Sequence, residues 1–365
     1  MKIAVFPLDD SEIKPLYSDP NKLRFCELFT DRMFTMVYNS STGWQNPEIK
    51  KNSPFQLTPS TIVLHYGQEI FEGLKAFRAC DGSINFFRPE ENAKRFNRSA
   101  KRMCMPTVPE EDFLESIETL ISLEERWVPN VRGTSLYIRP FMFATDTKLG
   151  VRASSNYIFC VILSPVGQYY PEGFNPISLF VTENLTRAVK GGIGEAKTGA
   201  NYAASLLAGQ EALKVGCSQV LWLDGLHHRF VEEVGAMNIF FVYKDVLVTP
   251  RLNGSILPGI TRDSVLTLGK HLGFKTEERE ISIDEVVKGI NSGEIMEVFG
   301  SGTAASISPV GNLKYKYTDN IINNGKVGTI SLKLYNFLLS LQYGEIEDPF
   351  GWIRKFKSKE FSGVA

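Results

Sequence analysis

The sequence predicts an α/β (α+β) protein of two domains, and three observations support this. A chain of 365 residues usually exceeds a single hydrophobic core. Strand-like and helix-like segments alternate along both halves of the chain. Between the halves, Ser164–Pro176 contains three prolines and two glycines, a composition typical of a linker. We therefore expect a small N-terminal domain over 1–164, an interdomain linker over 165–176 and a large C-terminal domain over 177–365.

In the first half, segments rich in β-branched and aromatic residues predict strands over 30–38, 60–66, 83–87, 134–143 and 157–166. A helix is expected to begin at Arg88-Pro89, because proline suits the first turn and the acids Glu90 and Glu91 suit the positive end of the helix dipole. A second helix is predicted over 112–126, where apolar residues recur at helical spacing.

In the second half, the same criteria predict strands over 177–181 and 219–223, within 238–249, and over 296–303, where a glycine turn ends the strand. A helix over 203–214 is expected to end at Gly216. Further helices are predicted over 261–272, 283–291 and 330–343.

Composition excludes several classes of protein. A hydrophobic content of 43%, a charged content of 22% and a net charge of −1 are typical of a soluble globular protein, and they argue against nucleic-acid or anionic-membrane partners. No apolar run approaches the ~20 residues of a membrane span, and the apolar N-terminal stretch is too short for a signal peptide. Five widely spaced cysteines favour reduced thiols in the cytoplasm, and four histidines make a metal site improbable.

The most informative segment is KGGIGEAKTGANY, residues 190–202, which contains Lys197. An isolated lysine is usually a solvated surface group. Here the surrounding glycines allow the backbone to approach a ligand closely. A lysine buried beside a hydrophobic ring becomes a usable nucleophile and proton carrier.

The same segment also resembles a phosphate-binding P-loop, because Gly191 and Lys197-Thr198 have the spacing of that motif. Two features weigh against a nucleotidase. Ala196 replaces the glycine that precedes the P-loop lysine, and the strand predicted over 177–181 ends well before the loop.

Two later segments could serve the lysine. Glu233 opens an apolar run, and it either lies at a strand entrance in water or is a buried carboxylate that faces a pyridinium nitrogen. Leu257-Pro-Gly-Ile-Thr261 forms a tight turn before a predicted helix, where free N–H groups bind phosphate well. Gly300–Thr303 offers a second anion-binding turn, and Arg95 a cation. An amine, a buried acid and anion-binding turns are what pyridoxal phosphate chemistry requires.

With these residues assembled, the chain resembles the branched-chain amino acid aminotransferases, which are fold-type IV pyridoxal phosphate enzymes. The resemblance runs in order from about Phe25 to Tyr343. It rests on the lysine segment and on YGQEIFEGLKAF (66–77), LYIRP (136–140), EVGAMN (233–238), LPGITR (257–262) and FGSGTA (299–304). It implies two domains, each a mixed sheet or barrel packed with helices.

The resemblance also implies roles toward pyridoxal 5'-phosphate. Lys197 would form the Schiff base and later carry the proton. Glu233 would hold the pyridine nitrogen, Tyr202 the phenolic oxygen, and Leu257 would pack on the ring. The phosphate would be bound by Arg95, by the N–H groups of Ile260 and Thr261, and by Thr303.

Toward substrate, the resemblance implies an apolar side-chain pocket and a separate polar contact. The pocket would be lined by Phe25, Phe71, Tyr137 and Tyr169, and the backbone near Ala304 would meet the substrate carboxylate. Arg139 and Tyr66 would receive the distal carboxylate of glutamate. Val151 would reach in from a second subunit, which implies a homodimer.

The implied activity is reversible, ping-pong amino transfer between L-leucine, L-isoleucine or L-valine and 2-oxoglutarate. Ala305 and Ser308 stand where some animal members have a Cys-x-x-Cys pair, so a thiol switch is not expected. A D-amino acid transaminase or an aminodeoxychorismate lyase would keep the fold and cofactor and change the substrate. A noncatalytic binding module would need no buried amine.

Overall fold

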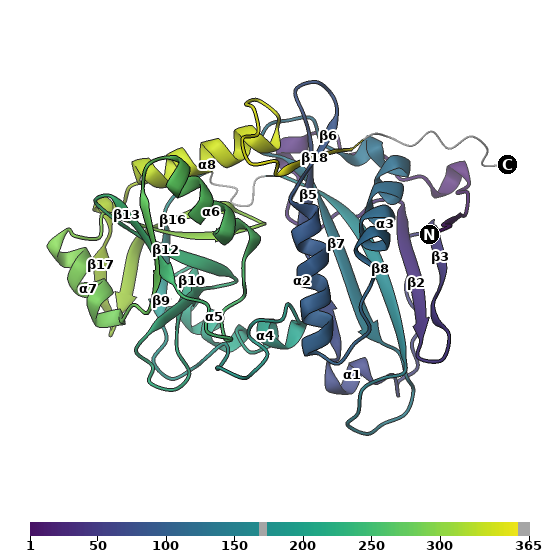
Figure 1. Cartoon of the computed structure of the whole chain (residues 1–365), viewed down its shortest axis with the longest axis horizontal. Coiled ribbons are helices and arrows are strands. Elements are labelled where there is room, and N and C mark those ends of the chain that lie inside the picture. Colours follow the sequence, from purple (N-terminus) through teal and green to yellow (C-terminus); the bar gives the residue numbers. More distant parts are fainter. Residues whose placement is uncertain (168–173, 357–365) are drawn as a thin grey trace. The chain divides into compact units, whose positions relative to one another are not determined.

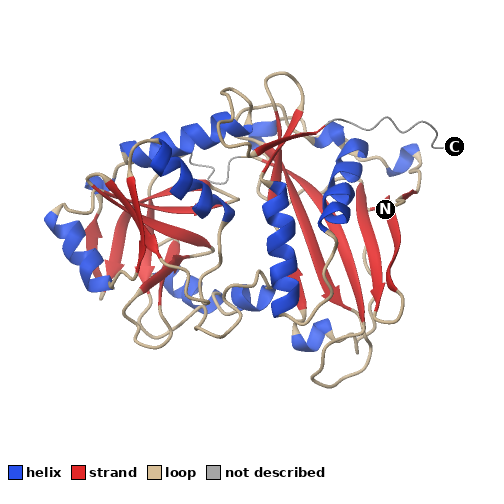
Figure 2. Ribbon diagram, in the orientation of Figure 1, coloured by secondary structure: helices blue, strands red, loops and turns tan. Residues whose placement is uncertain are grey.

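The computed structural model describes residues 1–167 and 174–356, which form two compact units. The first unit holds residues 1–167, 196–199 and 339–356 of the described chain, and the second holds residues 174–195 and 200–338. The predicted linker 165–176 begins with the last residues of a strand, and its residues 168–173 lie outside the described part of the chain. Each unit has a sheet core with helices against it (Figure 2).

In the first unit, a sheet has the strand order β1-β3-β2-β8-β7-β5-β6-β18, and β4 also pairs with β7. The bounds of these strands are β1 Ala4–Val5, β2 Arg32–Asn39, β3 Gly43–Lys51, β4 Glu69–Phe71, β5 Leu74–Arg78, β6 Ile84–Phe87, β7 Ser135–Ala144, β8 Asn156–Val166 and β18 Ile353–Phe356. The helices of this unit are α1 Val63–Tyr66, α2 Pro89–Arg102 and α3 Glu110–Leu123.

Helices α2 and α3 cover one face of this sheet (Figure 1). Phe96 of α2 and Phe113 of α3 are fully buried against Phe159 of β8. Alternate residues of β7, including Leu136 and Ile138, belong to the same core. Because side chains alternate along a strand, Tyr137 and Arg139 of β7 lie on the opposite face, away from the helices.

The second unit contains a barrel. Its sheet has the order β11-β10-β9-β16-β15-β12-β13-β14, β17 pairs with β16, and an additional β11–β12 pairing closes a ring of six strands. The bounds are β9 Ile177–Val181, β10 Gln219–Leu223, β11 Val231–Val234, β12 Met237–Tyr243, β13 Val246–Pro250, β14 Lys275–Arg279, β15 Glu297–Gly302, β16 Ser306–Tyr315 and β17 Thr318–Ile321. Helices α5 Leu206–Lys214, α6 Ile260–His271 and α7 Ile283–Ser292 belong to this unit, which also holds most residues of α4 Gly199–Ala203 and α8 Thr329–Gln342.

The predicted α/β fold, with helices packed on a mixed sheet or barrel in each part, is confirmed, and most predicted elements have a counterpart within a few residues. The strand predicted over 60–66 is wrong, because Val63–Tyr66 form the short helix α1. The Thr61 hydroxyl bonds to the Thr58 carbonyl, and Gly67, at φ +61°, closes the helix in the left-handed conformation. These local hydrogen bonds outweigh the β propensity of Thr61, Ile62 and Val63.

Across residues 1–167 and 174–356, none of the helices combines the length and the apolar character that crossing a membrane requires.

Candidate active site

Lys197 lies in the loop that leads from β9 into α4, and it belongs to the first unit together with Ala196, Thr198 and Gly199. Its backbone N–H donates to the Ser99 hydroxyl of α2 at 2.9 Å, and its carbonyl accepts from the Phe71 N–H of β4 at 3.0 Å. The half-buried side chain places Nζ 4.9 Å from the centroid of the Phe71 ring. The amine therefore lies against an aromatic face.

The face that meets the lysine combines aromatic rings with the cation of Arg139. The Arg139 guanidinium lies 4.6 Å from the Phe71 ring centroid and 5.3 Å from that of Tyr137, and it donates to the Tyr137 hydroxyl at 3.0 Å. The Phe25 ring meets Tyr137 edge-on at 5.0 Å. The structure thus brings together four of the residues predicted to contact substrate, Phe25, Phe71, Tyr137 and Arg139.

The other predicted substrate residues of the first unit have different surroundings. Tyr66, at the end of α1, is 44% exposed, and its hydroxyl accepts from the Gly150 N–H at 3.2 Å. Val151, in the loop before β8, is 89% exposed. Tyr169 lies outside the described residues.

Arg95, predicted to bind phosphate, is 3% exposed on α2. Glu72 holds it with two hydrogen bonds, from Nε at 2.7 Å and from an Nη at 2.9 Å. Asn92 also donates to Glu72 at 2.7 Å. Burial raises the pKa of the Glu72 carboxyl, and the Arg95 cation more than offsets this, so the pKa is lowered and the carboxylate stays ionised. The guanidinium is therefore held in one orientation.

In the second unit, Glu233 is 3% exposed on β11. Its carboxylate forms an ion pair with Arg187 at 2.6 Å and accepts from Asn238 and from the Leu257 N–H, both at 3.2 Å. Glu233 is therefore buried and not in water at a strand entrance, and its contact with a pyridinium nitrogen stays a prediction. A buried acid that keeps its charge requires a fixed cation, and Arg187 fills that need.

The turn at 257–261 has the geometry of an anion site. Helix α6 begins at Ile260 after Gly259, and no side chain caps its start. The first N–H groups of a helix have no acceptor within the helix and create a positive dipole potential at its start. Asn238 donates to the Leu257 carbonyl at 2.9 Å, and its Oδ1 lies against Gly259, where a side chain would collide with it. The turn is therefore fixed by β12.

The remaining predicted cofactor residues, Thr303 and Tyr202, and the predicted substrate residue Ala304 lie in a turn or near the end of a helix. Thr303 and Ala304 belong to the half-buried turn that joins β15 to β16. Tyr202 is half-buried on α4, where the neighbouring Asn201 donates to the Ile193 carbonyl at 2.9 Å. Turn and helix-end positions leave backbone N–H groups and side chains available to a ligand.

Sequence reasoning missed several charged residues of these clusters. Glu72, Glu69 and Lys75 stand inside the 66–77 motif, and Arg187 stands in the segment before the lysine. Lys75 of β5 lies opposite Tyr137 of β7, and burial lowers the pKa of its ammonium to about 8. One general rule could have pointed to these residues: a buried arginine or glutamate requires a partner of opposite charge.

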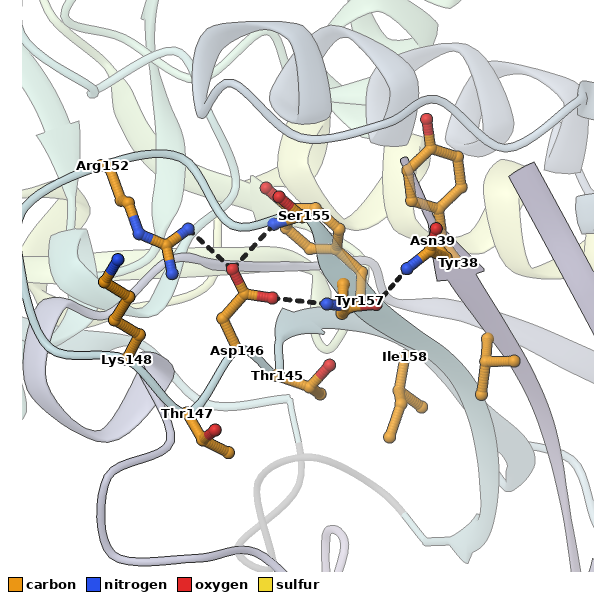
Figure 3. A pocket seen from close by; sticks show the side chains of 12 residues that line it. Tyr38, Asn39, Thr145, Asp146, Thr147, Lys148, Arg152, Ser155, Tyr157 and Ile158 are labelled. Carbon is orange, nitrogen blue, oxygen red and sulfur yellow. Dashed lines mark hydrogen bonds and ion pairs between the residues drawn. The ribbon is translucent and has the colours of Figure 1, made fainter. Parts of the chain in front are cut away.

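A separate pocket of about 850 Å³ lies in the first unit, at the ends of β2, β7 and β8 (Figure 3). Asp146 accepts from Arg152 at 2.7 Å, from the Ser155 N–H at 3.0 Å and from Asn156 at 2.7 Å. Burial opposes ionisation, but these donors outweigh it and lower the pKa of Asp146 to about 2. Its lining includes none of the predicted site residues among those that the structure describes, so we do not place the chemistry here.

Comparison with known proteins assigns the chain to a class. Residues 69–313 match the family described as amino-transferase class IV, and the chain belongs to the branched-chain-amino-acid aminotransferases of that class. It is 51% identical to branched-chain-amino-acid aminotransferase 2 of Bacillus subtilis (strain 168) over 334 residues, which cover 92% of each chain. It is 46% identical to a probable branched-chain-amino-acid aminotransferase of Streptomyces coelicolor over 354 residues, 97% of each.

Solved structures agree with this assignment. The Escherichia coli branched-chain amino acid aminotransferase superposes with a TM-score of 0.73 at 28% identity, covering 88% of this chain and 99% of that one. A branched-chain amino acid aminotransferase from T.th., solved with pyridoxamine 5'-phosphate, has a TM-score of 0.73 at 26% identity, covering 88% and 98%. This family membership sets aside the P-loop interpretation of the lysine segment.

Proposed function

We propose that this protein is a branched-chain amino acid transaminase with pyridoxal 5'-phosphate as its cofactor. It transfers an amino group reversibly between L-leucine, L-isoleucine or L-valine and 2-oxoglutarate in a ping-pong reaction. The observation that carries the proposal is the half-buried Lys197 amine, held against Phe71 on the face that also carries Tyr137 and Arg139.

When bound, the cofactor supplies an electron-withdrawing ring that stabilises negative charge at the substrate α-carbon. In this proposal the Lys197 ε-amine would hold the cofactor through its aldehyde, and the same amine would move the proton to and from the substrate α-carbon. The two backbone hydrogen bonds of Lys197, to Ser99 and Phe71, orient the side chain for both steps.

The remaining predicted cofactor residues would bind the cofactor and hold it in one orientation. Glu233 would bind the pyridine nitrogen, and the Arg187 ion pair fixes the position of its carboxylate. Arg95, the N–H groups of Ile260 and Thr261, and Thr303 bind the phosphate. Tyr202 donates to the phenolic oxygen, and Leu257 packs on the ring. A fixed guanidinium beside Glu72 and an uncapped helix start suit a phosphate dianion.

The substrate residues account for two unlike substrates. The rings of Phe25, Phe71 and Tyr137, with Tyr169, bind branched aliphatic side chains at ~0.8 kcal/mol per buried CH₂. Arg139, with Tyr66, binds the distal carboxylate of glutamate, and the backbone at Ala304 meets the α-carboxylate. A hydrophobic pocket discriminates one methylene by only about 1–3 kcal/mol, so leucine, isoleucine and valine are all expected to react.

We also propose a cytoplasmic homodimer in which Val151 contributes to the partner's substrate site. Exposed apolar side chains support a subunit contact, because association removes apolar surface from water. Val151 is 89% exposed, and Leu206 and Leu213, on one face of α5, are 67% and 68% exposed. The free thiols of Cys26, Cys80, Cys104, Cys160 and Cys217 suit a reducing compartment.

The test combines colour, covalent trapping and turnover. Purified protein should be yellow, and borohydride should bleach it and leave a pyridoxyl mass on the peptide that contains Lys197. Lys197→Ala should abolish transamination of L-leucine and leave the circular dichroism spectrum unchanged. Retained turnover in this variant would refute the role of Lys197, and faster turnover of D-alanine than of L-leucine by the wild type would refute the substrate class.

A further inference from the structure

We propose that Glu69 is a positioning residue for Lys197: its carboxylate fastens the chain segment that carries the lysine to strand β4. Only the predicted effect of Glu69 on turnover rests on the proposed function. The contact itself lies within the first unit, to which both β4 and residues 196–199 belong.

The hydrogen bonds of Glu69 reach the two residues that follow the lysine. One carboxylate oxygen of Glu69 accepts from the Gly199 N–H, and the same oxygen lies 3.3 Å from the Thr198 hydroxyl. Phe71, two residues along β4, donates its N–H to the Lys197 carbonyl at 3.0 Å. The strand therefore contacts three consecutive residues of the lysine segment.

Gly199 provides an independent observation for this contact. A Cβ added to Gly199 would meet Glu69 Oε1 at 2.6 Å and Cδ at 3.3 Å. The carboxylate therefore occupies the space where any other residue would place its side chain. Because the carboxylate is the end of a flexible side chain, an alanine at this position would displace Glu69 more readily than it would unfold the protein.

Burial and charge suit this role. Glu69 is half-buried, and burial raises the pKa of its carboxyl, opposed by hydrogen bonds from Gly199 and Thr198 and by the charge of Arg139. A carboxyl oxygen can accept both hydrogen bonds whether or not the group is ionised. Glu69 and Phe71 share one side of β4, because side chains alternate along a strand. The carboxylate therefore lies on the face of the sheet that carries Arg139.

The effect of Glu69 on turnover follows from the way the backbone of Lys197 is held. The amine of Lys197 is carried by a backbone that Ser99, Phe71 and Glu69 hold through Lys197–Gly199. A misplacement of a reacting group by about 1 Å can cost on the order of 10²-fold in rate. Loss of the Glu69 contact should therefore lower kcat and leave substrate binding largely intact.

The experiment compares Glu69→Ala, Glu69→Gln and Gly199→Ala in the cofactor-loaded enzyme. Glu69→Ala and Gly199→Ala should each lower kcat for L-leucine by about 10- to 100-fold with KM changed by less than about 3-fold. Both should shift the midpoint of the pH titration of the bound cofactor's absorbance. Glu69→Gln keeps an acceptor oxygen and should recover kcat to within about 5-fold of the wild type. The double variant E69A/G199A should be no slower than the slower single variant.

Glu124→Gln is the matched control. Glu124 is a buried carboxylate of the same unit that also accepts from a backbone N–H, that of Asp31 at 3.0 Å, and burial raises its pKa as well. This variant should lose stability without any shift in the absorbance midpoint. If Glu69→Ala matched the wild type in kcat and midpoint, or if Glu69→Gln were as impaired as Glu69→Ala, the proposal would be overturned.

Hydrogen exchange separates this inference from the proposed function. In cofactor-free protein, amides of the peptide that spans 197–203 should exchange faster in Glu69→Ala, and not in Glu69→Gln or Glu124→Gln. Unchanged exchange in Glu69→Ala would overturn the contact, whatever reaction the enzyme catalyses. A wild-type protein without leucine transamination would overturn the proposed function and leave the exchange result standing.

Discussion

Arg187 and Glu233 form an ion pair with little access to water, because their side chains are only 9% and 4% exposed. Arg187 also donates to the Ser255 carbonyl at 2.5 Å, so one guanidinium joins the Glu233 carboxylate to the loop before α6. Removing one partner of a buried ion pair leaves the other charge buried without a partner. The resulting loss of folding free energy is larger than the contribution of an exposed salt bridge.

Arg187→Leu should therefore destabilise the cofactor-free protein by about 3 kcal/mol and should also lower kcat. Urea unfolding measures the first effect and steady-state kinetics the second. The matched control is Arg251→Leu, because Arg251 pairs with Glu280 on the surface with 59% and 52% of the side chains exposed. The control should change stability by less than about 0.5 kcal/mol. If Arg187→Leu and Arg251→Leu lost equal free energy of unfolding, the Arg187–Glu233 pair would contribute no more to stability than an exposed salt bridge.

Lys75 predicts a pH dependence of stability. The pKa of its ammonium falls from 10.5 to about 8 on folding, because burial disfavours the charged form and the nearby Cys26 only partly opposes this. Between these two values the unfolded chain binds the proton more tightly than the folded chain does, so the cost of burying the charge is present below pH 8 and is relieved as pH rises.

Lys75→Met removes this cost, so its stability relative to the wild type should be greatest near pH 7 and should decline as pH rises from 8 to 10.5. Unfolding by urea at several pH values measures the difference, in which the titrations of groups that do not interact with Lys75 cancel. A difference that stays constant across this range would show that Lys75 is not desolvated.

At the scale of elements, a carboxylate from a neighbouring strand caps the N-terminus of helix α8. Glu297 of β15 accepts from the N–H groups of Ile330 at 2.9 Å and Ser331 at 2.8 Å, and from the Ser331 hydroxyl at 2.6 Å. The position preceding this turn is Gly328, where an added Cβ would collide with the Glu297 carboxylate. A negative charge at a helix start satisfies unpaired N–H groups and complements the helix dipole.

Glu297→Gln should lower the free energy of unfolding by about 1–2 kcal/mol, because the charge-assisted bonds to α8 are lost. Gly328→Ala should cost at least as much, because the carboxylate must leave its position. Thermal unfolding followed by circular dichroism measures both, with the exposed Glu294→Gln as the control that should leave the melting temperature unchanged. A melting temperature for Glu297→Gln equal to that of the control would exclude this capping role.

Helix α1 shows why some elements escape prediction. Thr61, Ile62 and Val63 have the β-branched composition of a strand, and the sequence offers no periodicity over so short a segment. The Ile62 N–H is bonded to the Asp146 carbonyl, a partner far along the chain. Longer elements such as α2 and β8 were predictable, because many residues repeat one pattern and their burial follows from it.

At the scale of the whole molecule, exposed apolar residues predict association. Leu206 and Leu213 lie about two helical turns apart on α5, so they share one face of that helix. The opposite face of α5 buries Ala208 and Ala212 against Trp222 of β10. One face of this helix is thus packed within the unit, and the other presents leucines outward.

The wild type should sediment at about twice 40.9 kDa, and the double variant L206E/L213E should sediment as a monomer, because two charges would be buried at the subunit contact. Tyr317→Ser is the control, since Tyr317 is 82% exposed in the turn between β16 and β17. Analytical ultracentrifugation distinguishes the outcomes. A double variant that remains dimeric would exclude this face from the interface.

The sequence by itself determined the class of protein and predicted its chemical centre. Lys197, Glu233 and the 257–261 turn each stand in a short, ordered motif, and such motifs depend on residue type and spacing alone. The alternation of strands and helices was equally local, because side-chain periodicity follows from backbone geometry.

Only the tertiary structure decided which groups hold that centre in place. Glu69 and Ser99 support Lys197 from distant positions in the chain, Arg187 pairs with Glu233, and the β11–β12 pairing closes the barrel. Contacts between distant residues have no fixed spacing along the chain. They follow from which faces are buried together and from the requirement that every buried charge find a partner.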